Sequence, residues 1–425
     1  MNIKRYLNKK YNLHVIENDN FRSCSFEISF RSKFDPKKSI AFSLLADILT
    51  DQSVKYPTSK YITRHLEESF ILNFYGSFTR VGRTMQTHIF CDYVDPKYID
   101  DKKYLENTFK FIFEVISNPV IIDNGFEEKN FNIVKNKLIK ELNEYTGNNK
   151  FISLKNALKL FTNHENISFH AIDLMDFLQN LTKEDLYNYY IDLISNSSVD
   201  IFVSGSSDKT IIKKLVDKYY PFNNTTYEKY DDLTYAKNRI VPKIKFDKSH
   251  YKQSSVVMIC NTNCLTMFER EFVMPFYLNI LNNNGLSSKL YQNLREKNSL
   301  CYGVNSTYKD RCNYLIIRSN VIVGKERKAI KLIKKSLNEM KKNISDKEFI
   351  GAYYNYQSSL KGLLDSLSAI TRLYLNCYFA GYSTYEEKKK LFKKVTVNDI
   401  YNLSKKIRLN TIYVLKGDMN ERDND

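Results

Sequence analysis

The side chains of this chain best suited to binding a catalytic metal are its six histidines, which are His14, His65, His88, His164, His170 and His250. Two histidines spaced i and i+4 on a helix can hold a zinc ion, and a glutamate beside them can activate a water molecule. No two of these histidines form H-x-x-E-H or H-E-x-x-H. We therefore assign no catalytic residue and no metal ligand from the sequence.

One segment, His65-Leu66-Glu67-Glu68-Ser69, comes within one residue of that motif. We interpret His65 and Glu68 as a solvated i, i+3 pair on a helix, because such short motifs often match by chance. A displaced metal site at His65 stays as the alternative. His164 and His170 are six residues apart, which does not suit one helical face, so we interpret them as surface residues.

The segment from Gly285 to Tyr302 is the second part of the chain whose side chains could have a functional role. Its sequence is GLSSKLYQNLREKNSLCY. The pattern predicts a serine-capped helix that ends near Arg295 and is followed by a strand that carries Tyr302. The structural interpretation is that Arg295 ends the helix favourably and Tyr302 packs on a sheet.

The sequence gives little support for a nucleotide-binding site, a serine hydrolase site or a cysteine-based site. The chain has no phosphate-binding loop, no dinucleotide-binding glycine motif and no G-x-S-x-G. Its seven cysteines are scattered, and the spacing of Cys260 and Cys264 suits neither a zinc ribbon nor a redox CxxC motif. Reduced, mostly buried thiols are the expectation.

The elements that must position these residues are mainly helical, because 425 residues contain only 12 Gly and 7 Pro while 43% are hydrophobic. The N-terminal part predicts strands, two short helices, more strand and then longer helices. Their approximate ranges are 12–17 and 24–30 for the strands, a helix from 38, a helix from 58 to 70, strand character over 78–94, and helices over 104–116 and 126–144.

A polar stretch over residues 223–252 lacks sustained helical periodicity, and we take it as a linker between residues 1–222 and 253–425. The element order recurs beyond it, including an amphipathic helix over 325–340 and a long helix over 346–378. Locally, residues 181–205 resemble residues 395–417, and Tyr75-Gly76 parallels Tyr302-Gly303. We therefore predict a tandem duplication of an α+β unit.

The 285–302 segment and the duplication together resemble the pitrilysin/insulinase family, whose members carry a similar G-x-S-S-R-L-x-x-x-x-R-E-x-x-x-L-x-Y segment in their C-terminal half. The resemblance implies two similar α/β-sandwich halves that enclose a chamber. Each half would have a mixed, mainly antiparallel sheet with helices on one face. In active members the first helix of the N-terminal half carries H-x-x-E-H, and a later helix supplies a glutamate as the third zinc ligand.

By this resemblance, the zinc-motif positions are degenerate in this chain. Ser43 and Asp47 stand where the two histidines would be, and Ala46 stands where the general base would be. A hydroxyl and one carboxylate make a poor zinc site, and alanine cannot move a proton. The third-ligand position falls at Asn136 or Lys137. The chain thus resembles the non-catalytic bacterial members that lack the motif.

The resemblance also implies that Arg295 and Tyr302 face substrate, where a guanidinium and a phenol can bind a peptide or a developing oxyanion. We expect a subunit that is inactive on its own, needs no cofactor, and pairs with a zinc-bearing homologue or with itself to bind or process peptides. The first alternative is an active zinc metalloendopeptidase with relocated ligands, and the second is a basic nucleic-acid-binding protein.

The net charge of +17 does not by itself identify a partner, because no block of five or more like charges stands out. We therefore expect neither nucleic acid nor membrane as a partner. The basic N-terminus is not followed by an apolar region, and no run of 18 apolar residues occurs. A cytoplasmic location is the expectation.

Overall fold

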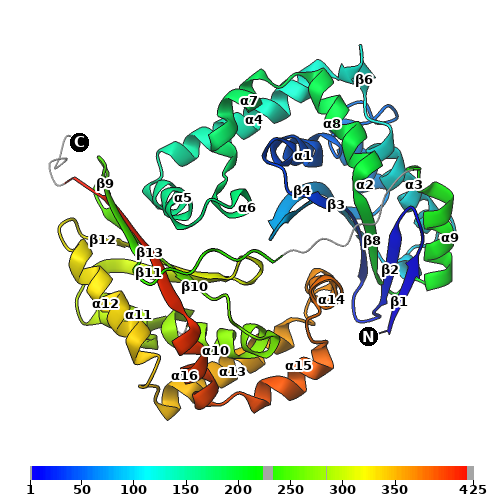
Figure 1. The fold of residues 1–425 in the computed structure, drawn as a ribbon. Helices are drawn as coiled ribbons and strands as arrows, with labels where there is room; N and C mark the ends of the chain where they lie inside the picture. The colour runs from blue at the N-terminus through cyan, green and yellow to red at the C-terminus, as the bar shows by residue number, and fades with distance from the viewer. Residues whose placement is uncertain (1, 224–232, 284, 419–425) are drawn as a thin grey trace. The chain divides into compact units, whose positions relative to one another are not determined.

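The computed structural model describes residues 2–223, 233–283 and 285–418, and the chain forms two compact units (Figure 1). The first unit comprises Met1–Asn143, His170–Asp232 and Ser366–Arg372. The second comprises Glu144–Phe169, Leu233–Asp365 and Leu373–Asp425. Each unit is therefore assembled from segments that alternate along the chain.

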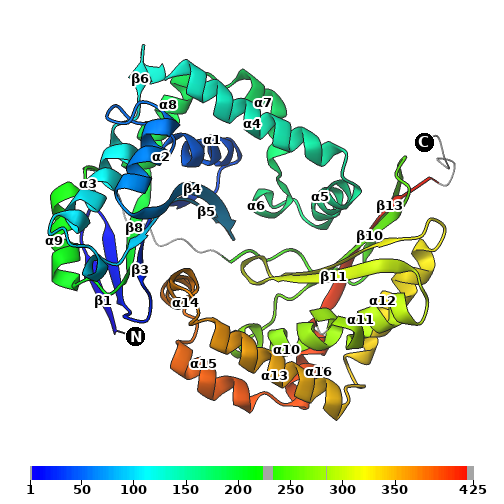
Figure 2. The same ribbon diagram turned by 180° about the vertical axis from the view of Figure 1, so that it is seen from behind.

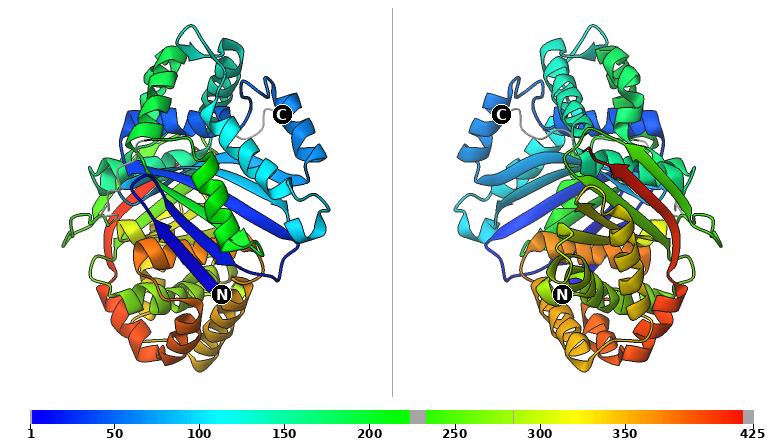
Figure 3. Two further views of the ribbon diagram at one scale, coloured as in Figure 1. Left: turned by 90° about the vertical axis from the view of Figure 1, so that its right-hand side faces the viewer. Right: turned by 90° about the vertical axis from the view of Figure 1, so that its left-hand side faces the viewer.

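The first unit is built on a six-stranded sheet with the strand order β1-β2-β8-β3-β5-β4. Only β2 and β8 are parallel, and the other neighbours are antiparallel. The N-terminal hairpin of β1 and β2 lies beside α9 (Lys209–Tyr219) (Figure 3), whereas β4 is the strand at the other edge. The strands are β1 (Asn2–Leu7), β2 (Asn12–Glu17), β3 (Ser23–Lys33), β4 (Ile71–Val81), β5 (Thr84–Val94) and β8 (Ser198–Gly205).

The helices of the first unit pack on the apolar face of this sheet, which follows from the alternation in β3. Phe26 of β3 is buried, and its ring meets the rings of Phe109 and Phe113 edge to face, with centroids 5.5 and 5.7 Å apart. The helices are α1 (Pro36–Ile48), α2 (Ser59–Glu68), α3 (Tyr104–Ser117), α4 (Glu128–Thr146), α7 (Met175–Asn180), α8 (Lys183–Asn196) and α9 (Lys209–Tyr219), and a small hairpin pairs β6 (Ile121–Ile122) with β7 (Gly125–Phe126).

The second unit has a five-stranded sheet with the strand order β11-β12-β10-β13-β9, in which only β9 and β13 are parallel. Its strands are β9 (Lys243–Lys248), β10 (Ser254–Asn261), β11 (Cys301–Lys309), β12 (Tyr314–Val321) and β13 (Arg408–Lys416). Its helical layer is formed by α10 (Met274–Leu278), α11 (Lys289–Tyr291), α12 (Glu326–Glu339), α13 (Asp346–Gly362), α15 (Tyr385–Leu391) and α16 (Val397–Lys406), with α14 (Leu367–Ala380) shared between the units (Figure 2).

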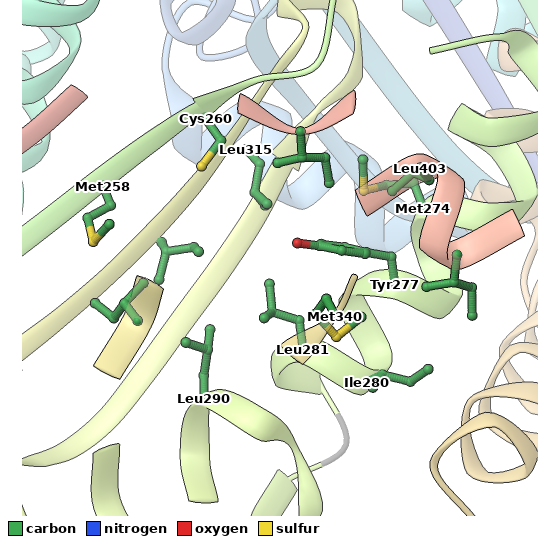
Figure 4. Close-up of a cluster of buried hydrophobic side chains, with 14 of the residues drawn as sticks. Met258, Cys260, Met274, Tyr277, Ile280, Leu281, Leu290, Leu315, Met340 and Leu403 are labelled. Atoms are coloured by element: carbon green, nitrogen blue, oxygen red, sulfur yellow. The ribbon is translucent and has the colours of Figure 1, made fainter. Parts of the chain in front are cut away.

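The main core of the second unit lies between this sheet and the helical layer (Figure 4). Strand residues such as Met258, Cys260 and Leu315 meet Tyr277 and Leu403 from the helices, and all five are fully or almost fully buried. Burial raises the pKa of the Cys260 thiol to about 12, so this cysteine is a neutral core residue.

The opposite face of the same sheet is covered by α5 (Asn149–Phe161) and α6 (Glu165–Ser168). Phe161 is buried and meets Tyr314 of β12 with ring centroids 5.4 Å apart, and the hydroxyls of Ser153 and Ser255 are 2.7 Å apart. These two helices therefore add a layer to the second unit although they precede most of it in the chain.

The structure refines three element ranges. The predicted strand character of residues 78–94 is a hairpin of β4 and β5, and the predicted helix of residues 346–378 is divided into α13 and α14. Within the predicted linker of residues 223–252, residues 224–232 lie outside the described part of the chain, and Lys243–Lys248 form β9. The mixed α/β architecture predicted from the sequence is confirmed.

Candidate functional site

Helix α1 carries the three positions that the sequence analysis compared with a zinc motif. The helix begins where Asp35 accepts a hydrogen bond from the Lys38 amide at 2.8 Å. Ser43 and Asp47 are one turn apart and both half-buried, whereas Ala46 between them is 1% exposed. The alternation of buried and accessible positions along α1 therefore presents Ser43 and Asp47 on one face.

A lysine from α4 lies directly against Asp47. The Lys137 ammonium is 2.9 Å from Oδ2 of Asp47, while Asn136 beside it is exposed. This hydrogen bond raises the pKa of Lys137, which is therefore a cation at neutral pH. One turn further along the chain, burial, reinforced by the charge of Asp47, raises the pKa of Asp51 above 3.8.

These side chains do not fit a zinc ion. The Ser43 hydroxyl donates to the carbonyl of Ile40 at 2.8 Å, and the Asp47 carboxylate is already paired with an ammonium group. Zinc in proteins needs three or four nitrogen, sulfur or carboxylate donors, and a cation in contact with the site opposes the metal charge. Among the described residues, nowhere do three His, Cys, Asp or Glu side chains gather as a metal site would require.

The buried side of α1 is held very close to strand β4, and these two elements are neighbours in Figure 1. A Cβ atom added to Gly76 of β4 would lie 1.6 Å from the carbonyl oxygen of Ala46. Only glycine allows this approach. The backbone at Ala46 is thus covered by β4.

His65 is engaged in packing. Its ring lies 4.6 Å from that of Phe111 and 4.9 Å from that of Tyr56, and burial lowers its pKa. Glu68 accepts a hydrogen bond from Arg64 at 2.7 Å, so its direct partner is one turn away at i, i+4. The charge of Glu68 also acts on His65, where it opposes the lowering of the His65 pKa by burial.

Two other histidines form buried pairs with single carboxylates, which the sequence analysis did not find. His14 Nε2 is 3.1 Å from Asp200 Oδ1, and His88 Nδ1 is 2.8 Å from Glu27 Oε1. Each pair joins neighbouring strands of the first sheet. The residues of each pair are far apart in the sequence, so no local motif signals them.

In the second unit, Arg295 is positioned by a turn of π-helix, η6 (Gln292–Glu296), that continues α11. The turn is closed by the hydrogen bond from the Lys297 amide to the Gln292 carbonyl at 3.0 Å. Such turns often occur at functional positions in helices. Here the turn directs the guanidinium toward the first residues of β11.

Arg295 is held by two tyrosines. Its guanidinium carbon lies 4.9 Å from the ring centre of Tyr291 and 5.4 Å from that of Tyr302. Nη1 donates to the Tyr302 carbonyl at 3.0 Å and to the Tyr291 hydroxyl. We call Tyr291, Arg295 and Tyr302 the arginine–tyrosine cluster. Tyr291 was missed by the sequence analysis, although its i, i+4 spacing from Arg295 on a helix was a usable signal.

Tyr302 is 88% exposed, because the strand is irregular at this point. The pairing of β11 with β12 shifts register between Cys301 and Val304, and the Ser319 hydroxyl donates to the Gly303 carbonyl at 2.8 Å. An irregularity of this kind at a sheet edge redirects a side chain outward. Nε of Arg295 lies 3.9 Å from Oε1 of Glu296. The cluster thus offers the remaining guanidinium N–H groups and a phenol, which can bind a carbonyl or carboxylate but cannot by themselves activate water.

Comparisons with known proteins agree on one family. Residues 180–352 match the family model described as Peptidase M16 inactive domain. The chain is 20% identical over 407 residues to the probable inactive metalloprotease YmfF of Bacillus subtilis (strain 168), and the match covers 95% of each protein. Within the described residues, no helix combines the length and apolarity needed to cross a bilayer.

Solved structures share the fold. A conserved protein from Enterococcus faecalis V583 matches with a TM-score of 0.92 over 100% of both chains at 22% identity. A chain of Complex III2 from Candida albicans matches with a TM-score of 0.71 over 98% of this chain and 96% of that chain at 12% identity, so the fold also occurs in a multisubunit complex. Residues 180–352 are thus similar to the Peptidase M16 inactive domain, and the chain over 407 residues is similar to a probable inactive metalloprotease.

Proposed function

We propose that this chain is a non-catalytic peptide-binding subunit that pairs with a homologue bearing an intact zinc motif. The observation that carries the proposal is the contrast between its two candidate sites. The arginine–tyrosine cluster is assembled and accessible, whereas the α1 positions carry an ion pair in place of a metal-binding set. A chain with this combination can bind a peptide group but needs another chain to hydrolyse it.

The surroundings of the cluster suit an extended peptide. β11 is an edge strand, so its outer backbone groups are available to pair with an added strand. The Arg295 guanidinium can hydrogen-bond to a peptide carbonyl or carboxylate next to that strand, and the exposed Tyr302 ring can pack on a side chain.

The test is peptide cleavage by the purified chain, alone and mixed with a homologue that carries H-x-x-E-H. We expect no cleavage by this chain alone and cleavage by the mixture, which should also co-purify. Arg295→Ala should reduce cleavage by the mixture by about tenfold or more, in line with the loss of a charged hydrogen-bond donor to substrate. Arg327→Ala is the matched control, because Arg327 is an exposed arginine on α12.

Three outcomes would contradict the proposal. If the chain associated with no zinc-bearing homologue, the proposed pairing would be wrong. If the Arg295→Ala mixture cleaved peptide as fast as the mixture with the unchanged chain, the proposed role of the cluster would be wrong. Stoichiometric zinc in the purified chain, lost on His65→Ala, would favour an active peptidase with relocated ligands. The packing of His65 between Tyr56 and Phe111 gives that alternative no support.

A further inference from the structure

Helix α12 belongs to the helical layer of the second unit (Figure 2). The helix and the residues next to it gather much of the positive charge of the chain on one exposed face. Residues 325–342 contain eight basic and two acidic side chains, a net charge of six out of +17 for the whole chain. All eight basic residues are exposed, and we call them the basic face: Lys325, Arg327, Lys328, Lys331, Lys334, Lys335, Lys341 and Lys342.

The two acidic residues leave most of this charge uncompensated. Glu326 is buried and accepts hydrogen bonds from the Ser254 hydroxyl at 2.6 Å and the Gly324 amide at 2.9 Å. Glu339 lies 3.8 Å from Lys335 and accepts from Asn293 at 3.0 Å. In the described part of the chain, no carboxylate forms an ion pair with Lys331, Lys334, Lys341 or Lys342. These four ammonium groups are therefore available to an external anion.

Two cavities lie among these lysines. One, of about 210 Å³, lies between α12 and α16 and is lined by Lys334, Lys341 and Ser404, among others. The other, of about 440 Å³, lies along α12 and is lined by Lys331, Lys335 and Lys342, among others. The first cavity gives room for an anionic group beside two ammonium groups, and the second gives room for one beside four ammonium groups and the carboxylate of Glu339.

The composition of the basic face distinguishes between kinds of anionic partner. Seven of its eight residues are lysines, which attract phosphate as point charges, whereas nucleic-acid readout and protein interfaces favour arginine and aromatic residues. The face contains no aromatic residue. The other side of α12 packs in the core through Ala329, Ile330 and Ile333, so the helix cannot insert an apolar face into a bilayer. Clusters of four to eight lysines on a helix suit the phosphates of anionic lipids.

We infer that the basic face docks the second unit electrostatically on a membrane surface rich in anionic phospholipid. The sequence alone gave no reason to expect a membrane partner, and the gathering of the lysines on one helix supplies that reason. The inference is independent of the proposed peptide binding, because it uses neither the arginine–tyrosine cluster nor α1.

The test is sedimentation of the full chain with vesicles, one set containing phosphatidylglycerol and the other phosphatidylcholine alone. Binding should occur only to the anionic vesicles and should weaken steeply as salt is raised. The triple variant Lys331→Gln/Lys334→Gln/Lys335→Gln should lose affinity on the order of 100-fold, because each lysine at an anionic surface is worth roughly fivefold.

A matched variant, Lys102→Gln/Lys103→Gln/Lys110→Gln, removes the same charge from exposed positions at and near α3 of the first unit. It should change affinity by less than about twofold per lysine, because lysines outside the basic face act on the vesicle only through screened long-range attraction. Thermal unfolding of both variants checks that they fold. Equal binding to both vesicle types, or equal loss in both variants, would overturn the inference. So would salt-sensitive binding to mixed-sequence RNA that the α12 variant abolishes, without vesicle binding, since the face would then serve nucleic acid.

Discussion

At the scale of single residues, Gly76 and Gly303 stand in parallel Tyr-Gly pairs of the two halves, but only Gly76 meets another element. We expect Gly76→Ala to lower the free energy of unfolding by about 3 kcal/mol or more, because its Cβ would overlap the Ala46 backbone. Gly303→Ala should change it by less than about 0.5 kcal/mol, since nothing lies within 4 Å of the added atom. Denaturant unfolding of both variants measures the difference, and equal effects would contradict the close approach of α1 and β4.

The Asp47–Lys137 ion pair predicts that a zinc site introduced on α1 will have low affinity as long as Lys137 is present. The combined change Ser43→His, Ala46→Glu and Asp47→His supplies two histidine ligands and the glutamate of the motif but leaves the Lys137 ammonium beside them. Adding Lys137→Glu removes that charge and supplies a third ligand. We expect the fourfold variant to bind zinc at least about tenfold more tightly than the threefold one, because a nearby cation opposes Zn²⁺.

Zinc competition against a chromogenic chelator measures both affinities. A fourfold variant with Asn136→Glu in place of Lys137→Glu is the control, because Asn136 is exposed and leaves the ammonium in place. If the Asn136 variant bound zinc with the same affinity as the Lys137 variant, α4 would not face α1 through Lys137.

At the scale of elements, one ion pair ties the helix that leads to Arg295 to its neighbour. Lys289 of α11 is 2.7 Å from Glu348 of α13, with side chains 9% and 22% exposed. Burial alone would raise the pKa of Glu348, but hydrogen bonds from Lys289 and the Ser345 amide lower it below 4.5 overall. The charged form is therefore favoured by folding, and its contribution is present above pH 4.5 and lost as the pH falls through the lowered pKa.

We expect Glu348→Gln to lower the free energy of unfolding at pH 7 by about 1–3 kcal/mol, the range for a hydrogen bond to a charged group. The difference from the unchanged chain should shrink as the pH falls below 4.5. Unfolding by urea at several pH values checks this. Glu386→Gln removes a more exposed glutamate, 3.5 Å from Lys389, and should have little effect at any pH.

The elements that the sequence predicted are those with a buried face. Helix α12 and strands β2 and β3 show the expected periodicity because one side of each packs in a core. Strand β9 was assigned to a linker because nearly all of its residues are exposed, and its pairing with β13 depends on the backbone and leaves no alternation in the sequence. Arg295 and Tyr302 are close in the sequence and in space, whereas the contact of Asp47 with Lys137 spans 90 residues and needed the fold.

At the scale of the whole molecule, the second unit depends on helix α5, which is separated along the chain from the rest of that unit by His170–Asp232 of the first unit. Phe161 of α5 is 1% exposed and packs against the sheet of that unit. The sequence cannot say which sheet α5 covers, because the apolar face of such a helix is the same in either case.

We expect Phe161→Ala to destabilise the second unit by about 3–5 kcal/mol, the usual cost of removing a buried phenylalanine. Hydrogen exchange should accelerate in β10 and β13 more than in β3 and β5. Phe151→Ala, a less buried change on the same helix, is the control. Equal acceleration in both sheets would show that the two units unfold together.

Because segments of the two units alternate along the chain, the order of synthesis on the ribosome also decides when each unit can be completed. The hydroxyls of Ser204 in β8 and Thr371 in α14 are buried, 2.7 Å apart and 167 residues apart in sequence, and both belong to the first unit. At about 5–20 residues per second, Thr371 is made about 8–30 s after Ser204. The first unit must therefore wait, incomplete, while most of the second is translated, and a chaperone that holds nascent chains would meet it in that interval.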